Sequence, residues 1–198
     1  REPVGLHDDG RALGVHVGVG RARLLEARPA GGGGAAGVAE LEIVVDSQER
    51  YGYSFKDQQA TTRRARLPAG DYGVMLGDSL LAAVELKSLP DLISSLTTGK
   101  LRYQLADLAS VPRAAVVVED RYSQVFKSEH VRPAVVADGL AECQLRWPSV
   151  PILFLETRAL AQEWTYRFLA GALAAAEQEY GGEVAVRELA PARPLAPA

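Results

Sequence analysis

The sequence has little of several residue types, and each shortage excludes a class of protein. Cys143 is the one cysteine among 198 residues, so an internal disulfide scaffold cannot form. The three histidines, His7, His16 and His130, are scattered without metal-ligand spacing and predict no zinc site. The longest run without a charged residue is 11 residues at 29–39, mostly glycine and alanine, which is too short for a transmembrane helix.

The net charge and the N-terminal residues exclude further classes of protein. The net charge is −3 and the hydrophobic fraction is 47%, values that exclude a disordered chain. The mild acidity argues weakly against a nucleic-acid partner, because dedicated binders are usually basic. No secretory signal precedes the apolar segments, so a cytoplasmic location is expected. The chain starts at Arg1 rather than Met, and we therefore expect a fragment or a processed form.

Composition divides the chain into three parts. Alternating valines predict one strand at 13–19, and the glycine-rich stretch 31–37 is typical of a flexible linker, so residues 1–37 form an N-terminal extension. Prolines among alanines at 183–198 indicate a frayed tail. The folded domain is predicted at 38–182.

Within that domain, strands alternate with helices. Short apolar runs predict buried strands at 41–45, 114–118 and 151–155. Between the first two, a hairpin is expected from arms at 60–67, 71–76 and 80–87, with turns at 68–70 and 77–78. Apolar spacing predicts helices at 91–109, interrupted by Gly99, at 135–146 and at 158–180. The fold class is therefore α/β, with a central mixed sheet.

Carboxylates gather where these strands end. Asp46 and Glu49 follow the first strand, Asp71 follows the turn at 68–70, and Asp91 begins a helix. Glu85 and Lys87 are two residues apart in a strand and therefore share one face. Converging carboxylates repel one another and need a cation, and oxygen ligands suit Mg²⁺ or Mn²⁺.

The pattern Asp71, then Glu85-Leu86-Lys87, is the D…ExK arrangement of metal-dependent phosphodiester hydrolases. In such a site the lysine orients a water molecule or stabilises charge on the phosphate. The pattern alone has little specificity, because a chain with 25 acidic residues matches it by chance. The alternative is a hairpin whose exposed face carries solvated charges.

The flanking residues make the pattern specific. The segment resembles the nuclease domain of the XPF-type (ERCC-four) structure-specific endonuclease family, in compact bacterial or phage form. Four motifs occur in the family's order: Asp46-Ser47-Gln48-Glu49, Gly70-Asp71-Tyr72, Glu85-Leu86-Lys87-Ser88-Leu89-Pro90-Asp91, and Gly99-Lys100-Leu101-Arg102-Tyr103-Gln104. The resemblance covers about residues 41–180.

The resemblance implies a three-layer restriction-endonuclease-like core, with helices on both faces of the sheet and the site on the hairpin. It implies metal-dependent cleavage of branched, flapped or forked DNA in repair or recombination, at the nucleoid, by a homodimer or heterodimer. Asp71, Glu85 and the Leu86 carbonyl would hold the metal, and Lys87 would act beside the attacking water. Asp46, Glu49 and Asp91 would complete the acidic cluster. Lys100, Arg102 and Gln104 would face the DNA or brace the acids.

Two positions depart from the family pattern. Leu86 and Gln48 stand where relatives carry arginine, so two cations near the site are missing. Leu86 points away from Glu85 and Lys87, and every carboxylate is kept. An active site is therefore favoured, and the alternative is a non-catalytic DNA-binding or dimerisation subunit.

Two further segments have open roles. Arg63, Arg64 and Arg66 either contact phosphates or protect a strand edge by their charge. The apolar face at 168–176 packs on the sheet or on a partner chain, and the resemblance implies a dimer through these C-terminal helices. With 15 basic and 19 acidic residues in 38–180, modest, salt-sensitive and metal-dependent DNA affinity is expected.

Overall fold

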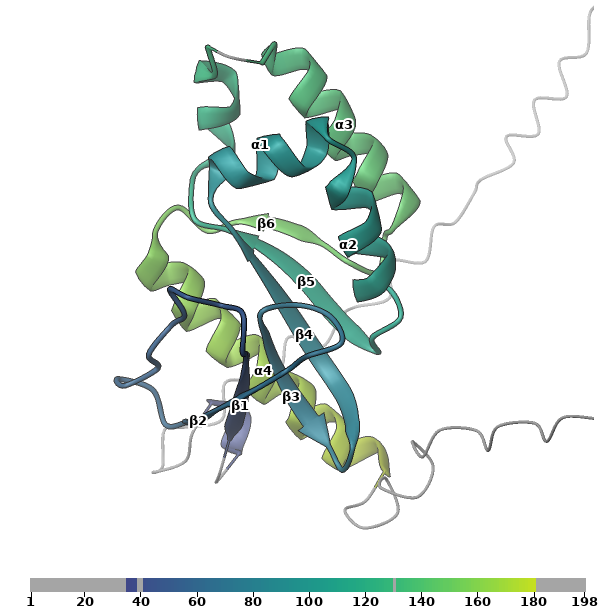
Figure 1. Cartoon of the computed structure of the whole chain (residues 1–198). Helices are drawn as coiled ribbons and strands as arrows, with labels where there is room; N and C mark the ends of the chain where they lie inside the picture. Colours follow the sequence, from purple (N-terminus) through teal and green to yellow (C-terminus); the bar gives the residue numbers. More distant parts are fainter. Residues whose placement is uncertain (1–34, 39–40, 130, 181–198) are drawn as a thin grey trace, which may run out of the picture. The chain divides into compact units, whose positions relative to one another are not determined.

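The computed structural model describes residues 35–38, 41–129 and 131–180 (Figure 1). The expected strand at 13–19, the tail at 183–198 and all three histidines lie outside the described residues. At the end of the predicted linker, Ala35–Gly37 forms a short 3₁₀ helix, η1, which contacts the last helix of the chain.

Six strands form one mixed sheet in the order β2-β1-β3-β4-β5-β6. Strand β3 pairs antiparallel with β1 and with β4, and the remaining neighbours are parallel. This confirms the predicted α/β class with a mixed sheet. The strands are β1 (Glu42–Asp46), β2 (Thr61–Ala65), β3 (Tyr72–Leu76), β4 (Ser79–Lys87), β5 (Arg113–Val118) and β6 (Ile152–Phe154).

The position of β2 corrects part of the hairpin prediction. The segment at 60–67 was expected beside 71–76, but β2 pairs parallel with β1, and β1 separates it from β3. The chain after β2 instead wraps around the end of β1, where the Leu67 N–H donates to Asp46 Oδ2 at 2.7 Å. β2 is an almost fully exposed edge strand, so its pattern of apolar and polar residues carries no information about its partner.

The second half of the prediction, a hairpin of β3 and β4, is confirmed. Its turn is Gly77-Asp78, and Gly77 has a φ of 59°, a conformation that glycine adopts without strain. In this register Tyr72 lies opposite Val84. The residue before β3, Asp71, therefore comes next to the end of β4 that carries Glu85.

Helices cover both faces of the sheet (Figure 1). α4 (Arg158–Tyr180) packs on one face, and α1 (Leu89–Thr97), α2 (Lys100–Leu108) and α3 (Pro133–Arg146) pack on the other. Successive β5 residues divide between the two cores, with Val117 on the α4 side and Val116 on the other. A 3₁₀ helix at Tyr122–Lys127, η2, was not predicted.

The helix predictions are confirmed almost to the residue. Gly99, with a φ of 78°, separates α1 from α2, as its position in the predicted helix indicated. On α4, Leu169, Ala172 and Ala176 are buried in the core of their own chain. Of the two roles left open for the face at 168–176, packing on the sheet is therefore the one observed.

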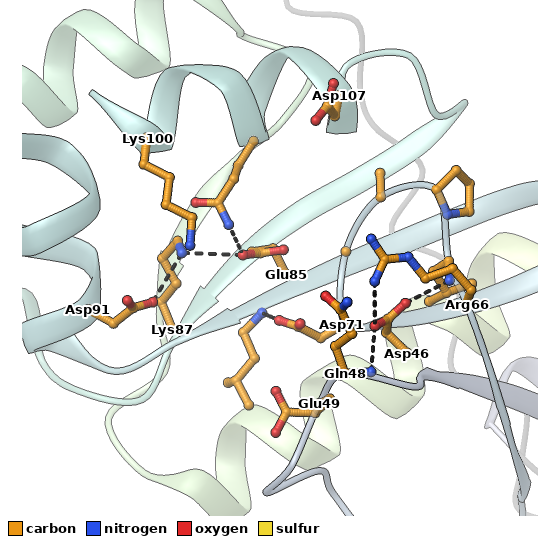
Figure 2. A pocket seen from close by; sticks show the side chains of 16 residues that line it. Asp46, Gln48, Glu49, Arg66, Asp71, Glu85, Lys87, Asp91, Lys100 and Asp107 are labelled. Atoms are coloured by element: carbon orange, nitrogen blue, oxygen red, sulfur yellow. Dashed lines mark hydrogen bonds and ion pairs between the residues drawn. The ribbon is translucent and has the colours of Figure 1, made fainter. Parts of the chain in front are cut away.

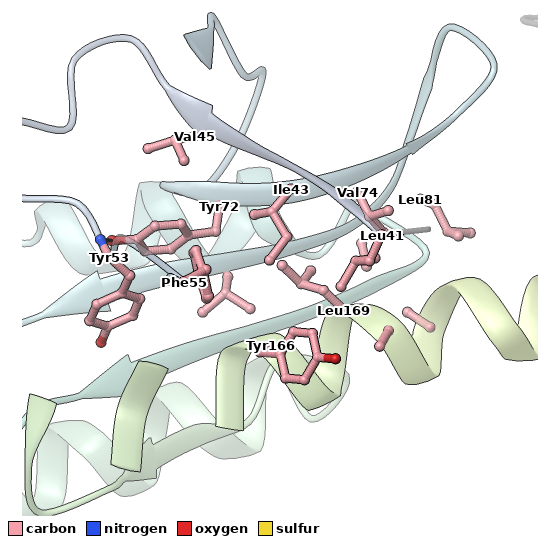
Figure 3. Close-up of a cluster of buried hydrophobic side chains, with 14 of the residues drawn as sticks. Leu41, Ile43, Val45, Tyr53, Phe55, Tyr72, Val74, Leu81, Tyr166 and Leu169 are labelled. Atoms are coloured by element: carbon pink, nitrogen blue, oxygen red, sulfur yellow. Dashed lines mark hydrogen bonds between the residues drawn. The ribbon is translucent and has the colours of Figure 1, made fainter. Parts of the chain in front are cut away.

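An aromatic cluster fastens the crossover loop, residues 47–60, which connects β1 to β2. Tyr53 stacks on Tyr72 with ring centroids 4.9 Å apart, and the Tyr53 N–H donates to the Tyr72 hydroxyl at 2.8 Å (Figure 3). Phe55 lies edge-on to both rings. From α4, Arg158 covers the Tyr53 ring at 4.8 Å and donates to the Tyr51 carbonyl. The middle of the loop is thereby held in a fixed place.

Gly70, directly before Asp71, has no room for a side chain. Its φ is 77°, and a Cβ there would lie 3.1 Å from the Val84 carbonyl oxygen. We expect Gly70→Ala to lower the free energy of unfolding by about 1–2 kcal/mol or more, from the left-handed conformation alone. Urea denaturation measures the change.

Gly171→Ala is the matched control, because a Cβ there meets nothing within 4 Å. That variant should gain about 0.5–1 kcal/mol of stability, since alanine is the better residue inside α4. Equal stabilities for the two variants would contradict the strain at Gly70.

Candidate active site

A pocket of about 380 Å³ lies beside the β3–β4 hairpin, where the ends of several elements meet (Figure 2). All six residues predicted as catalytic line it: Asp46, Glu49, Asp71, Glu85, Lys87 and Asp91. Of the predicted DNA contacts, Arg66, Lys100 and Gln104 line it, whereas Arg63, Arg64 and Arg102 do not. Residues far apart in the sequence thus share one polar pocket.

Asp71 is positioned by the hairpin register. Its N–H donates to the Val84 carbonyl at 2.9 Å, and its side-chain Oδ2 accepts the Leu86 N–H at 2.7 Å. The neighbouring strand is tied in as well, because the Asp46 N–H donates to the Asp71 carbonyl at 2.8 Å. The carboxylate is therefore fixed against β4 with its second oxygen, Oδ1, outside these hydrogen bonds.

Lys87 is the most buried charge in the pocket, with 2% of the residue exposed. Its ammonium donates to Glu85 Oε1 at 3.2 Å, to Asp91 Oδ2 at 3.1 Å and to Ser95 Oγ at 3.4 Å. All three N–H groups are thus engaged. A buried cation needs this compensation, because an unpaired charge in the interior costs several kcal/mol.

Asp46 and Glu49 line the pocket and also accept hydrogen bonds from backbone N–H groups. Asp46 Oδ1 accepts the Gln48 N–H at 2.8 Å, and Oδ2 accepts the N–H of Leu67. Glu49 Oε1 accepts the Tyr51 N–H at 2.5 Å. Asp46 therefore joins the end of β1 to the segment that follows β2, and each of its oxygens already has a backbone donor.

The predicted basic residues differ in what they contact. Arg63 pairs with Glu42 at 2.9 Å, and Arg102 pairs with Glu142 on α3 at 2.9 Å, both outside the pocket lining. Arg64 donates to the Glu49 carbonyl at 2.9 Å. The two cations at the rim are Arg66, 3.9 Å from Asp46, and Lys100, whose charge acts on Glu85.

Two residues of the site were missed from the sequence. Ser95, buried on α1, contacts Lys87, and Asp107 lines the pocket from α2. A signal existed for Asp107, because residues 100, 104 and 107 follow the i, i+4, i+7 spacing of one helix face. Ser95 lies four residues after Asp91, on the same face of α1, and carried the same signal.

Burial and like charges raise the pKa values of the two central carboxyls. Burial, followed by the charge of Glu85, raises the pKa of Asp71 to about 7, against the opposing hydrogen bond from Leu86. Burial also raises the pKa of Glu85, although Lys87 beside it lowers that pKa. A site that makes two carboxylates costly to ionise is one that a divalent cation stabilises.

The oxygen donors of the pocket fit a hard cation. Mg²⁺ typically takes one or two carboxylates and keeps several waters. Asp71 and Glu85 supply that number, and each uses only one carboxylate oxygen in its hydrogen bonds to the described residues, Oδ2 in Asp71 and Oε1 in Glu85. No group of three His, Cys, Asp or Glu able to enclose a metal occurs in the described part of the chain, so a dedicated all-protein cage is not formed there.

The two departures from the family pattern lie on different sides. Leu86 packs with the α4-side core, as its place in β4 predicted, so no pocket ligand is lost with it. Gln48, the second departure, lines the pocket. Only the second change alters the charge of the pocket wall.

The pocket lies within a stretch that matches a known family. The model of the ERCC4 domain matches residues 45–168. The chain belongs to the ERCC4 domain family. The match spans every residue of the pocket, from Asp46 to Asp107. A comparison with functionally curated proteins gives no match.

Solved structures agree with the family assignment at the level of the fold. XPF from Aeropyrum pernix is similar with a TM-score of 0.55 and 20% sequence identity, over 70% of each chain. The same protein in complex with DNA gives a TM-score of 0.54 and 20% identity, over 73% of this chain and 68% of that one. The α/β fold of this ERCC4 domain is thus similar to that of XPF from Aeropyrum pernix. In the described residues, no helix is long and apolar enough to cross a membrane.

The raised pKa of Asp71 predicts a pH-dependent stability. The Asp71 carboxyl has a pKa of about 7 in the fold and near its ordinary value when unfolded. Between about pH 4 and 7 the unfolded chain therefore releases a proton that the folded chain keeps, and the cost to stability grows over that range. At about 1.4 kcal/mol per unit, it reaches up to about 4 kcal/mol. Asp71→Asn should therefore unfold at higher temperature than the parent without metal, and the gain should grow between about pH 5 and 7.

Thermal unfolding in the presence of a chelator measures this gain. The control is Asp78→Asn in the exposed β3–β4 turn, which should show no comparable pH dependence. A gain for Asp71→Asn that is the same at every pH would contradict the raised pKa.

Proposed function

We propose that residues 38–182 form a Mg²⁺- or Mn²⁺-dependent DNA endonuclease domain, with a restriction-endonuclease-like core, that hydrolyses phosphodiester bonds at branched or flapped DNA in repair or recombination. The observation that carries the proposal is the convergence of Asp71, Glu85 and Lys87 on one pocket within an ERCC4 domain. Support for DNA as the substrate comes from the similar XPF structure, which is in complex with DNA.

The contacts of each acidic residue indicate which role it would have. Asp71 and Glu85 would hold the cation, with the Leu86 carbonyl as a third donor. When bound, the ion would polarise the scissile phosphate and make a water molecule more acidic. Asp46 and Glu49, whose oxygens hold backbone N–H groups, would keep the pocket wall in place. Asp91 would hold the Lys87 ammonium.

Lys87 would stabilise negative charge beside the acids. Because its three N–H groups are engaged, it can reach a water or a phosphate oxygen only by giving up one contact. The contact to Ser95 is the longest, at 3.4 Å, and goes to an uncharged partner. We propose that this bond is the one exchanged, while Glu85 and Asp91 hold the ammonium group in place.

A non-catalytic subunit is the alternative, motivated by Leu86 and Gln48. The retained set of acids and the buried lysine favour the hydrolase, because a pocket that only bound DNA would gain nothing from two carboxylates with raised pKa values. A dimer through the C-terminal helices stays a proposal. It would use surfaces other than the buried face at 168–176, which packs on its own sheet.

Cleavage of labelled flap, fork and duplex DNA tests the proposal. We expect metal-dependent cleavage that Glu85→Ala and Asp71→Asn each reduce by on the order of 10²–10³-fold or more, because each removes a charged group that stabilises the transition state. Asp78→Asn, in the exposed turn, should cleave like the parent. Cleavage that survives either pocket substitution would rule out this site, and binding without cleavage under any metal would favour the non-catalytic subunit.

DNA affinity should depend on the two cations at the pocket rim, Arg66 and Lys100, and not on the arginines that pair with glutamates outside the pocket. Arg66→Ala and Lys100→Ala should each weaken binding and lower the slope of log affinity against log salt by about 1, the loss of one phosphate contact. Arg63→Ala and Arg102→Ala are matched controls, since both arginines pair with a glutamate away from the pocket. Binding to labelled DNA at several salt concentrations measures the slopes, and equal losses in all four variants would contradict the assignment.

A further inference from the structure

Gln104 makes a contact that does not suit a DNA-binding side chain. It lies on α2, half-buried in the pocket wall, and its amide nitrogen donates to Glu85 Oε1. Its amide oxygen is buried and has no hydrogen-bond partner among the described residues. Gln104 thus offers its only donor group to a carboxylate of the site.

The orientation of this amide is set by Glu85. An ionised carboxylate accepts hydrogen bonds and cannot donate them, so the amide nitrogen rather than the oxygen must face it. This orientation leaves the amide oxygen of Gln104 buried without a partner among the described residues, which costs about 1–3 kcal/mol. No other hydrogen bond of the Gln104 side chain is found in the described structure, so the contact with Glu85 is what holds it.

Two donors converge on the same oxygen of Glu85. Lys87 reaches Oε1 from the same strand, at 3.2 Å, and Gln104 reaches it from α2. The second oxygen, Oε2, accepts no hydrogen bond from the described residues. Since a carboxylate held at one oxygen by donors from two directions cannot rotate freely, Oε2 keeps a constant direction.

We infer that Gln104 is a positioning residue: it holds Oε1 of Glu85 so that Oε2 is presented to a divalent cation in the pocket. This inference rests on the proposed metal-dependent function, and it removes Gln104 from the DNA contacts. Side chains that hold a metal-binding carboxylate typically contribute 10–100-fold to metal affinity, because they fix the direction of the ligand atom.

Gln104→Met tests the inference, because methionine has the same length and suits a helix but cannot donate a hydrogen bond. Arg102→Met is the matched control, on the same helix but outside the pocket. We measure Mn²⁺ binding by calorimetry on the full chain without DNA. Gln104→Met should bind Mn²⁺ about 10–100-fold more weakly than the parent, and Arg102→Met should bind it equally.

A double-mutant comparison separates positioning from general damage. In a Glu85→Gln background the cation has already lost the ligand that Gln104 orients, so adding Gln104→Met should change the remaining Mn²⁺ affinity by less than about 2-fold. The metal concentration needed for half-maximal cleavage should rise with the loss of affinity, whereas the rate at saturating metal should change much less. A merely structural role would lower the unfolding temperature and leave both metal measurements unchanged.

The outcomes distinguish this inference from the proposed function. Unchanged Mn²⁺ affinity in Gln104→Met, or an equal loss in the presence and absence of Glu85, would overturn the inference even if the parent cleaves DNA. A parent chain that binds Mn²⁺ but cleaves no DNA would remove the proposed function, and the weaker binding of Gln104→Met would still support the inference. A parent chain that binds no divalent cation would overturn both.

Discussion

The burial of one ammonium group is the constraint on which the candidate site depends. Lys87 can remain charged inside the domain only because two carboxylates and a hydroxyl surround it. Those partners come from β4 and α1, and Glu85 is held in turn from α2. The contacts that make the buried lysine tolerable therefore also join three elements into one wall of the pocket, so that the stability and the shape of the site have the same origin.

The two faces of the sheet differ in the residues that pack on them. On the α4 side the core is apolar and aromatic, and its side chains supply packing energy without any charged group among them. On the other side the apolar residues of β4 end at Ala83, and the next two residues of that strand face, Glu85 and Lys87, are charged. The site thus replaces part of a hydrophobic core by a hydrogen-bonded network. Such a network is rigid only when its members are satisfied, which explains the number of contacts around Lys87.

Local signals were sufficient to predict the strands and the α-helices of the described residues, whereas the partner of each strand and side chain depends on long-range packing. Gly99 and the turn at 77–78 determine where helices and a hairpin break, because the backbone conformation there favours glycine. The partner of β2 could not be predicted, since an exposed edge strand has no buried face to set it. Arg63 and Arg102 were predicted as DNA contacts from their positive charge. Their glutamate partners lie 21 and 40 residues away in the sequence, so the pairs could not be predicted from it. The contact of Gln104 with Glu85 spans 19 residues and depends on how α2 packs on β4.

The parallel pairing of β1 with β2 makes the crossover loop a place where the domain can change length. Parallel neighbours require the chain to return along the whole strand, so some connection must exist there. Only its first residues line the pocket. Tyr72 of β3 and Arg158 of α4 hold its middle, and Gln58 near its end contacts α4. Residues added beyond that anchor would enlarge the protein without moving Asp71 or Glu85. New segments can thus be added at this point of the chain while the candidate site stays unchanged.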